Sequence, residues 1–382
     1  MVPNGWKHKA FGDVVKLSKN KYDPQKSDKC FPCVELEHLT QETGQIVGST
    51  PASTLGSIKN QFNSGDVIFG KLRPYLKKYA MPNFDGVCSS EIWVFAPTKE
   101  IINPYLYQFV QTNTFITEAN KSAGSKMPRA DWEVVSEMQL PLPPLPEQRK
   151  IAKILSTWDK AIATTERLIA TSQQQKKALM QQLLTGKKRL VNPETGMVFE
   201  GDWEEVKLGD ISAPQQWSTI SSKELLDDGF PVYGANGHIG YFSEYNHEFE
   251  TVAVTCRGST CGEVSLIPER SYITGNAMCL DNINEEAHSY KFVFYALCYR
   301  GFKDVISGSA QPQIVGKAIK AVKFAVPALA EQQKIASVLT AADKEIELLE
   351  TKLAHLKEEK KALMQQLLTG KRRVKVDTTE AA

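Results

Sequence analysis

The sequence predicts an α+β protein: two mixed α/β lobes separated by two long antiparallel coiled-coil helices, with a pseudo-two-fold internal repeat. Three observations predict this fold. A long segment occurs twice, its apolar residues follow a helical period, and short apolar runs bounded by turn residues fill the stretches between the copies. The 382 residues are also many for one core, and 42% hydrophobic with 24% charged residues is typical of a globular protein.

The repeat places the boundaries of five regions. These are lobe one (1–145), a central helix region (146–190), lobe two (191–326), a distal helix region (327–375) and a tail (376–382).

The clearest part of the repeat lies in the two helix regions. Residues 147–189 and 331–373 are identical at 24 of 43 positions without a gap, and KKALMQQLLTGK at 176–187 recurs unchanged at 360–371. The lobes repeat more faintly, through Trp6, Gly12, Asp13, Gly124 and Pro128, which recur as Trp203, Gly209, Asp210, Gly308 and Pro312. The chain is therefore a duplicated pair of a lobe and a helix.

Each repeated segment predicts one helix, over 147–185 and 331–369. Apolar residues alternate in steps of four and three from Ile151 and from Ile335, which is a coiled-coil seam. Gly186 and Gly370 stand where a left-handed C-cap belongs. At about 1.5 Å per residue each helix is about 58 Å long. The first helix delivers the chain to lobe two, so pairing along the seams requires the second to run back.

The identical run also predicts a docking surface. It includes surface positions as well as seam positions, whereas packing alone requires only similar seams. A shared surface at both helix ends indicates one kind of partner bound twice; the alternative is that the helices form only an internal pair. The candidate docking residues are Lys176, Lys177, Gln181, Gln182, Lys360, Lys361, Gln365 and Gln366.

The lobes are read as mixed α and β structure. Apolar runs predict strands at 67–69, 92–95, 251–254 and 277–280, and aromatic amphipathic patterns predict helices at 104–117 and 289–303. Glycine-rich loops between them carry basic and amide side chains, the groups that bond bases and phosphates. Such loops also occur as plain turns. The candidate DNA contacts are Lys71, Arg73, Lys77, Lys78, Ser125, Lys126, Arg129, Asn236, His238, Arg257, Ser259, Thr260, Gln311 and Gln313.

Side-chain chemistry divides these candidates into two roles. Lys77 and Lys78 are interpreted as phosphate contacts, whose loss would weaken binding uniformly and reduce its salt dependence. Arg73, Arg257 and Gln313 are interpreted as base readers, because Arg pairs bidentately with guanine and Gln with adenine. The net charge of +2 is weak evidence for nucleic-acid binding by itself. Local charge matters more, and Lys71, Arg73, Lys77 and Lys78 form a basic cluster.

The sequence lacks the familiar marks of catalysis and of cofactor binding. It contains neither GxxxxGK[ST] nor HExxH, and no Asn/Asp-Pro-Pro-Tyr/Phe tetrapeptide of the kind an amino-methyltransferase uses. Gly234-x-x-Gly237-x-x-Gly240 lacks the spacing of a dinucleotide fingerprint. Seven cysteines without a second suitably spaced pair or a nearby histidine predict reduced thiols and no metal site. No apolar run resembles a secretory signal or a membrane span, so we expect a cytoplasmic protein with no membrane partner.

The whole pattern resembles the specificity subunit of type I restriction–modification systems. The resemblance rests on the order of lobe and helix and on the segments PLPPLPEQRKIAKIL and VPALAEQQKIASVL, each closing in LLTGK. It implies that the lobes are target recognition domains, each reading one half of a bipartite asymmetric site in double-stranded DNA. Recognition loops vary within that family, so individual base contacts are not transferred.

The resemblance also implies partners. Two modification methyltransferase subunits would flank this chain and methylate adenine, with S-adenosylmethionine bound to them and not to this chain, and motor-nuclease subunits would complete the restriction complex. The helices would dock these partners and set the spacing of the half-sites. Two alternatives stay open: a scaffold whose lobes bind protein, and a self-sufficient methyltransferase, against which the absent motifs speak.

Overall fold

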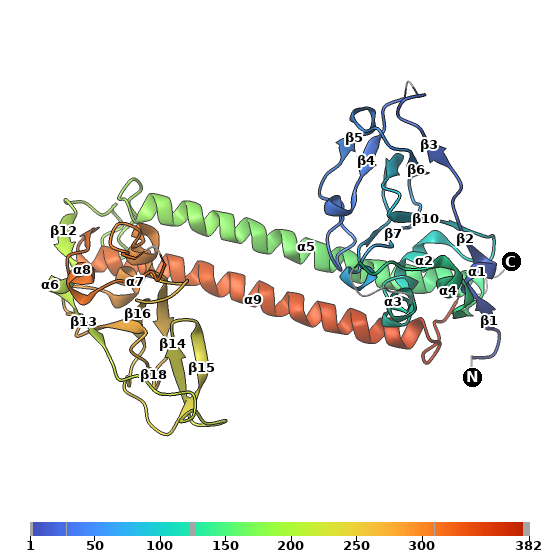
Figure 1. Cartoon of the computed structure of the whole chain (residues 1–382). Coiled ribbons are helices and arrows are strands. Elements are labelled where there is room, and N and C mark those ends of the chain that lie inside the picture. The colour runs from blue at the N-terminus through green and yellow to red at the C-terminus, as the bar shows by residue number, and fades with distance from the viewer. Residues whose placement is uncertain (1–2, 28, 122–126, 309, 377–382) are drawn as a thin grey trace. The chain divides into compact units, whose positions relative to one another are not determined.

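The computed structural model describes residues 3–27, 29–121, 127–308 and 310–376. The chain divides into two compact units, Met1–Glu166 with Lys352–Ala382 (unit 1) and Arg167–Thr351 (unit 2). Each unit therefore holds one lobe and part of both long helices, which are drawn in Figure 1 as α5 and α9. None of the helices formed by the described residues has the length and apolar character needed to cross a membrane.

Lobe one is built on two sheets and one strand pair. A four-stranded antiparallel sheet has the order β2-β10-β7-β8, a five-stranded sheet has the order β3-β6-β9-β4-β5, and β1 pairs with β11. The strands are β1 (Lys7–Ala10), β2 (Val15–Leu17), β3 (Lys21–Tyr22), β4 (Pro32–Val34), β5 (Thr50–Pro51), β6 (Lys59–Phe62), β7 (Ile68–Gly70), β8 (Tyr79–Ala80), β9 (Gly86–Cys88), β10 (Ile92–Pro97) and β11 (Gln139–Leu142). The predicted strands at 67–69 and 92–95 are thereby confirmed.

Short helices cover the four-stranded sheet of lobe one. They are α1 (Phe11–Val14), α2 (Asn103–Phe109), α3 (Asn113–Asn120) and α4 (Trp132–Glu137), with 3-10 turns η1 (Leu36–His38), η2 (Ala52–Thr54) and η3 (Pro74–Leu76). The single helix predicted over 104–117 was wrong, because the chain breaks between α2 and α3. Thr112 caps α3 by accepting a hydrogen bond from the Phe115 backbone N–H at 3.2 Å, a role that needs a non-helical backbone.

Lobe two repeats the central topology of lobe one. Its four-stranded sheet has the order β13-β19-β16-β17, β12 pairs with β20, and a separate sheet has the order β15-β14-β18. The strands are β12 (Glu204–Lys207), β13 (Ala213–Gln216), β14 (Phe230–Gly234), β15 (Gly237–Phe242), β16 (Thr251–Thr255), β17 (Val264–Ile267), β18 (Tyr272–Ile273), β19 (Ala277–Asp281) and β20 (Lys323–Val326). The helices are α6 (Leu208–Ile211), α7 (Tyr290–Arg300) and α8 (Gly316–Lys320), so the predicted strands at 251–254 and 277–280 and most of the predicted helix at 289–303 are confirmed.

The two long helices form where the repeat predicts them. They are α5 (Leu145–Leu183) and α9 (Leu329–Leu367), each two residues earlier than predicted. The φ angles of Gly186 and Gly370 are +68° and +74°, so both glycines take the predicted left-handed conformation.

Within each unit the segments of α5 and α9 run in opposite directions. In unit 1 the later residue Glu166 of α5 pairs with the earlier residue Lys357 of α9, while Asp159 pairs with Lys360. In unit 2 Lys176 of α5 pairs with Asp343 of α9. The predicted seam residues Ile151, Leu155, Ile335 and Leu339 are fully or almost fully buried in the lobe cores, whereas those in the middle of the helices, such as Ile162 and Ile346, are only partly buried.

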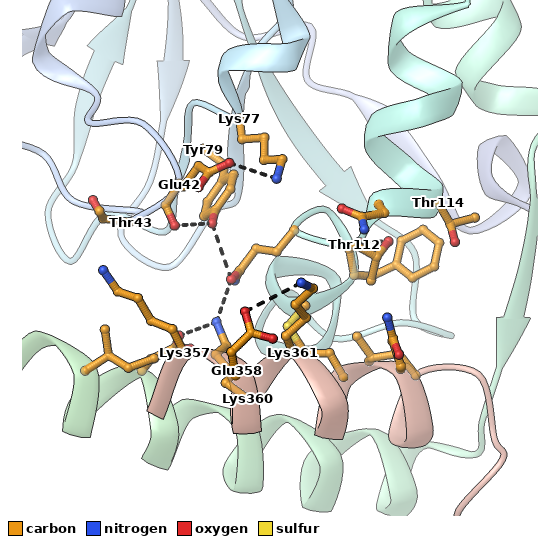
Figure 2. Close-up of a pocket in the computed structure, with 18 of the residues that line it drawn as sticks. Glu42, Thr43, Lys77, Tyr79, Thr112, Thr114, Lys357, Glu358, Lys360 and Lys361 are labelled. Carbon is orange, nitrogen blue, oxygen red and sulfur yellow. Dashed lines mark hydrogen bonds and ion pairs between the residues drawn. The ribbon is translucent and has the colours of Figure 1, made fainter. Parts of the chain in front are cut away.

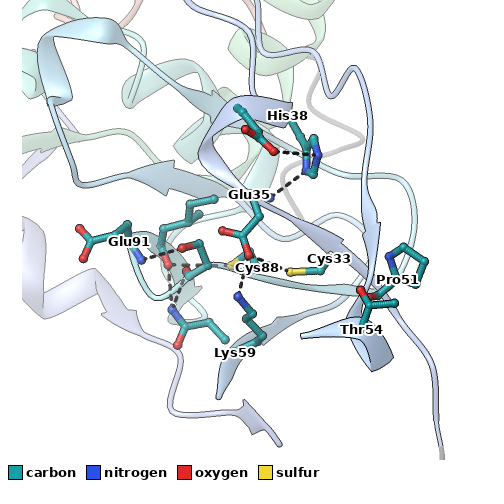
Figure 3. A network of polar contacts seen from close by, with 12 residues as sticks. Cys33, Glu35, His38, Pro51, Thr54, Lys59, Cys88 and Glu91 are labelled. Carbon is teal, nitrogen blue, oxygen red and sulfur yellow. Dashed lines mark hydrogen bonds and ion pairs between the residues drawn. The ribbon is translucent and has the colours of Figure 1, made fainter. Parts of the chain in front are cut away.

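A buried charge ties together the five-stranded sheet of lobe one (Figure 3). Lys59 on β6 is 6% exposed, and its ammonium donates to the Glu35 carboxylate at 2.6 Å. Burial acts against the ionised form of Glu35, but the hydrogen bond and charge of Lys59 outweigh it and lower the pKa of this carboxyl. Burial and the charge of Glu35 raise the pKa of the neighbouring Cys33 thiol to about 12. This cluster therefore has the character of a structural network.

A carboxylate at the start of each long helix is held by an arginine that follows the end of the other helix. In unit 2 Glu331 is 1% exposed and accepts from Nε and Nη2 of Arg189 at 2.6 and 2.7 Å. In unit 1 Glu147 is 6% exposed, pairs with Arg373 and accepts from Trp6 Nε1 at 3.2 Å. Gln148, which follows Glu147, accepts a hydrogen bond from the backbone N–H of Ile102 just before α2. Gln332, which follows Glu331, accepts one from the backbone N–H of Ser289 just before α7.

We expect Glu331→Gln to destabilise the protein by about 1.5–3 kcal/mol, the range for a hydrogen bond to a charged group, because Arg189 loses its buried counter-charge. Urea unfolding followed by circular dichroism measures this. Glu205→Gln is the matched control, since it breaks an ion pair with Lys323 in which both side chains are more than half exposed. Equal unfolding midpoints for the two variants would contradict the assigned role of the clamp.

Candidate nucleic-acid and partner interfaces

A strained basic loop follows β7 in lobe one. Arg73 and Lys77 flank η3 and have φ angles of +51° and +49°, a left-handed conformation that non-glycine residues adopt only when the surroundings impose it. The Arg73 backbone N–H donates to the Pro128 carbonyl at 2.7 Å, and Leu72 forms a β-bridge with Arg129. The fold thus brings the predicted residues Lys71, Arg73 and Arg129 together. Ser125 and Lys126 lie outside the described residues.

The basic residues of this loop differ in their surroundings. The Arg73 side chain is exposed, while Arg129 donates to Glu91 at 3.0 Å. The two predicted phosphate contacts are both engaged: Lys77 pairs with Glu42 at 2.8 Å, and the Lys78 ammonium donates to the Leu36 carbonyl at 2.6 Å. A phosphate role for these lysines stays a prediction. To contact a DNA phosphate, each lysine would have to leave the partner that it binds in this structure.

Three segments of lobe two that are distant in sequence meet at one place. Thr260 donates through its hydroxyl to the Ala235 carbonyl at 2.9 Å, which joins the loop after β16 to the tip of the β14–β15 hairpin. Arg257 forms a β-bridge with Gln313, and the Gly258 backbone N–H donates to the Pro312 carbonyl at 3.2 Å. The fold thereby gathers all seven predicted residues of lobe two, of which Asn236, His238, Arg257, Ser259, Gln311 and Gln313 are exposed.

The same backbone arrangement occurs in both lobes, which sequence reasoning missed. The bridge between Leu72 and Arg129 corresponds to that between Arg257 and Gln313, and the hydrogen bonds to Pro128 and Pro312 correspond as well. We call the two arrangements the bridged loops, formed by residues 71–73 with 127–129 and by 256–258 with 311–313. The recurrence of Pro128 as Pro312 was the available signal. Equivalent backbones therefore present different side chains.

The identical helix ends contain both internal and exposed residues. Leu183, Leu184, Leu367 and Leu368 are buried in the lobe cores. Lys360 is 9% exposed and bonds to Asp159 and to the Gln111 amide oxygen, and Lys176 pairs with Asp343. These two predicted docking lysines are therefore occupied inside the protein. The identical residues that remain exposed are Lys177, Ala178, Gln181, Gln182, Thr185 and Lys187, with Lys361, Ala362, Gln365, Gln366, Thr369 and Lys371 in the second copy.

A cavity of about 630 Å³ lies beside one of these ends, within unit 1. Figure 2 shows Lys357, Glu358, Lys360 and Lys361 of α9 on one side of it and Glu42 with Lys77 on the other. Its four lysines and four carboxylates form ion pairs, namely Lys77–Glu42, Lys357–Glu166, Lys360–Asp159 and Lys361–Glu358. The charges of the lining balance, so the cavity is not suited to holding a free phosphate.

Comparison with known proteins gives consistent matches along the chain. The family model of the type I restriction modification DNA specificity domain matches residues 3–171 and 200–358. The type I restriction enzyme MjaVIII specificity subunit of Methanocaldococcus jannaschii is similar, with 26% identity over 421 residues, covering 98% of this chain and 94% of that protein.

Two solved structures share the fold. The S subunit of a type I restriction-modification system from M. genitalium matches with a TM-score of 0.67 and 16% identity, over 95% of this chain and 96% of that chain. A structure described as the basis of complex assembly and conformational transition of the type I R-M system matches with a TM-score of 0.58 and 23% identity, over 97% of this chain and 100% of that chain.

These findings agree with the duplicated topology and with the resemblance carried by the helix segments. The family model matches twice, once in each half of the chain, and the relatives are specificity subunits, a non-catalytic family that recognises DNA. The chain therefore belongs to the family of DNA specificity subunits of type I restriction–modification systems.

Proposed function

We propose that each lobe reads one half of a bipartite, asymmetric site in double-stranded DNA through its bridged loop. The observation that carries this proposal is that equivalent backbones hold Lys71, Arg73 and Arg129 in lobe one but Arg257 and Gln313 in lobe two. A shared backbone would dock each lobe in the same way, and different side chains would select different bases. Arginine fits guanine and glutamine fits adenine, each by two hydrogen bonds.

We propose further that the exposed identical residues of the helix ends dock two copies of an adenine methyltransferase subunit. The internal roles of Lys176, Lys360 and the buried leucines account for part of the identity between the copies. Among the residues that the structure describes, no hydrogen bond or ion pair engages the side chains of the exposed Gln181, Gln182, Gln365 and Gln366. A partner that binds both ends supplies the missing constraint. S-adenosylmethionine then belongs to that partner, and restriction subunits join the same assembly.

The spacing of the half-sites follows from the helices in this account. Long, rigid helices paired as an antiparallel coiled coil with pseudo-two-fold symmetry would fix the gap between the recognised sequences. One heptad added to both helices corresponds to about 10 Å, or about three base pairs. Methylation of the original, unlengthened site by that variant would contradict this part of the proposal.

A scaffold whose lobes bind only protein remains the second candidate function. The family to which the chain belongs favours DNA, as do the exposed arginine and amide side chains gathered on the bridged loops. Measuring how DNA affinity depends on salt, with the methyltransferase partner present, separates the two candidates, because phosphate contacts release counterions.

We expect Arg73→Ala, Arg257→Ala and Gln313→Ala each to relax one position of the methylated motif, at a cost of about 1–3 kcal/mol in discrimination. Lys77→Ala and Lys78→Ala should instead weaken binding to all sequences and reduce its salt dependence. Methylome sequencing and DNA binding at several salt concentrations measure these effects. Arg300→Ala is the control, since its guanidinium is held by Asp304. An unchanged motif in all three base-reader variants would rule out the bridged loops as the reading surface.

We expect charge reversal at the exposed helix ends to change the number of bound methyltransferase subunits. The wild type should bind two, Lys177→Glu or Lys361→Glu alone should bind one, and the double variant should bind none, because each end holds one copy. Native mass spectrometry counts them. Lys153→Glu is the matched control, because Lys153 is exposed on α5 but has serine, Ser337, as its counterpart. Two bound subunits in the double variant would exclude this surface.

A further inference from the structure

Three side chains with metal-binding chemistry converge at the end of β19 in lobe two. Cys279 and Asp281 lie two residues apart on this strand, so their side chains share one face. His247 reaches the same place from the segment between β15 and β16. Their ligand atoms all lie within 4.8 Å of one another, and no other such group occurs in the described part of the chain.

The hydrogen bonds around Asn246 fix which nitrogen of His247 carries a proton. The Ile273 backbone N–H donates to Asn246 Oδ1 at 2.8 Å, and Asn246 Nδ2 donates to the Ile273 carbonyl at 3.0 Å. These two bonds set the orientation of the amide. Its oxygen therefore faces His247 Nδ1, at 2.7 Å, so Nδ1 must be the donor.

The other nitrogen of the ring then meets an acceptor. His247 Nε2 lies 3.1 Å from Asp281 Oδ1, while Asp281 Oδ2 is already engaged by the Trp217 indole N–H at 3.0 Å. The His247 and Asp281 side chains are only 9% and 16% exposed, so water screens them little. A neutral imidazole would place a lone pair against a carboxylate oxygen. The pair therefore needs a cation between its two atoms, which is either a proton or a metal ion.

The third side chain favours the metal. A proton between Nε2 and Oδ1 leaves the Cys279 sulfur only its packing contacts in a small buried apolar cluster, whereas a metal ion would bind nitrogen, oxygen and sulfur together. Such a mixed set suits zinc, which takes three protein ligands and one water in a tetrahedral arrangement. Asn246 and Trp217 already hold the far sides of the imidazole and the carboxylate, as outer partners do in metal sites.

We propose that His247 Nε2, Cys279 Sγ and Asp281 Oδ1 bind a divalent metal ion, zinc by ligand chemistry, with water as the fourth ligand. Binding forms the nitrogen–metal, oxygen–metal and sulfur–metal bonds and releases two protons to solvent, the proton that otherwise joins His247 Nε2 to Asp281 Oδ1 and the thiol proton of Cys279. Burial and the charge of Asp281 raise the pKa of the free Cys279 thiol, so the sulfur stays protonated until the metal arrives.

The bound ion would have a structural role in the recognition lobe. It would link β19, in the four-stranded sheet, to the segment that Asn246 ties to Ile273 on β18. Strand β18 pairs with β14, whose hairpin carries the exposed Asn236 and His238. The ion would therefore hold the base of this hairpin against the sheet that bears Arg257.

Cobalt(II) tests the proposal directly, because a cobalt–thiolate bond absorbs in the near ultraviolet and tetrahedral cobalt absorbs in the visible. Titration of the full-length, chelator-treated chain should saturate at one ion per chain with both bands. Cys279→Ser should lose the thiolate band, and the matched control Cys298→Ser, at an exposed cysteine of the same lobe, should keep it. Circular dichroism confirms that each variant is folded.

Zinc provides the second readout. It should raise the melting temperature of the wild type and of Cys298→Ser, and should leave that of Cys279→Ser and Asp281→Asn unchanged. Retention of the thiolate band in Cys279→Ser would place the ion elsewhere and overturn the assignment. No saturable binding to the wild type would mean that a proton alone joins His247 to Asp281, which also overturns it.

Discussion

The buried carboxylates at the starts of the two long helices impose the constraint on which both units depend. Glu147 and Glu331 are 6% and 1% exposed, and an ionised group that is so little hydrated requires an opposite charge. Each receives it from an arginine three residues beyond the glycine that ends the other helix, Arg373 after Gly370 and Arg189 after Gly186. The start of one helix, the end of the other and the neighbouring lobe are thereby joined in each unit.

This constraint explains much of the identity between the helix ends. The leucines fill equivalent lobe cores, the glycines permit the left-handed turn that redirects the chain, and Lys176 and Lys360 neutralise Asp343 and Asp159. The loops of the two lobes do not have to meet these packing, turn and charge requirements. Their sequences differ between the two copies. Internal structure thus accounts for the buried part of the identical run. The exposed lysine, glutamine and threonine residues are the part for which we invoke a partner.

Periodicity and turn chemistry were sufficient to predict the long helices, their glycine caps and four strands, because these depend on neighbours in the sequence. The clamp of Glu331 by Arg189 joins residues 142 positions apart, and no local pattern reveals it. The break at Thr112 was missed although the polar residues 111–114 interrupt the apolar pattern there and threonine is a favoured N-cap residue. The group of His247, Cys279 and Asp281 was missed for another reason: His247 lies 32 positions before Cys279, and only the tertiary fold brings it to the two residues on β19. The bridged loops required the same long-range information.

The central claim is that the two lobes recognise DNA independently on equivalent backbones. Exchanging residues 191–326 for the corresponding lobe of another family member, with both helix regions kept, tests it most directly. The variant is expressed with the proposed methyltransferase partner, and the methylated motif is mapped by methylome sequencing. We expect one half of the motif to change completely and the other half to stay as it was. A change in both halves, or in neither, would contradict the account.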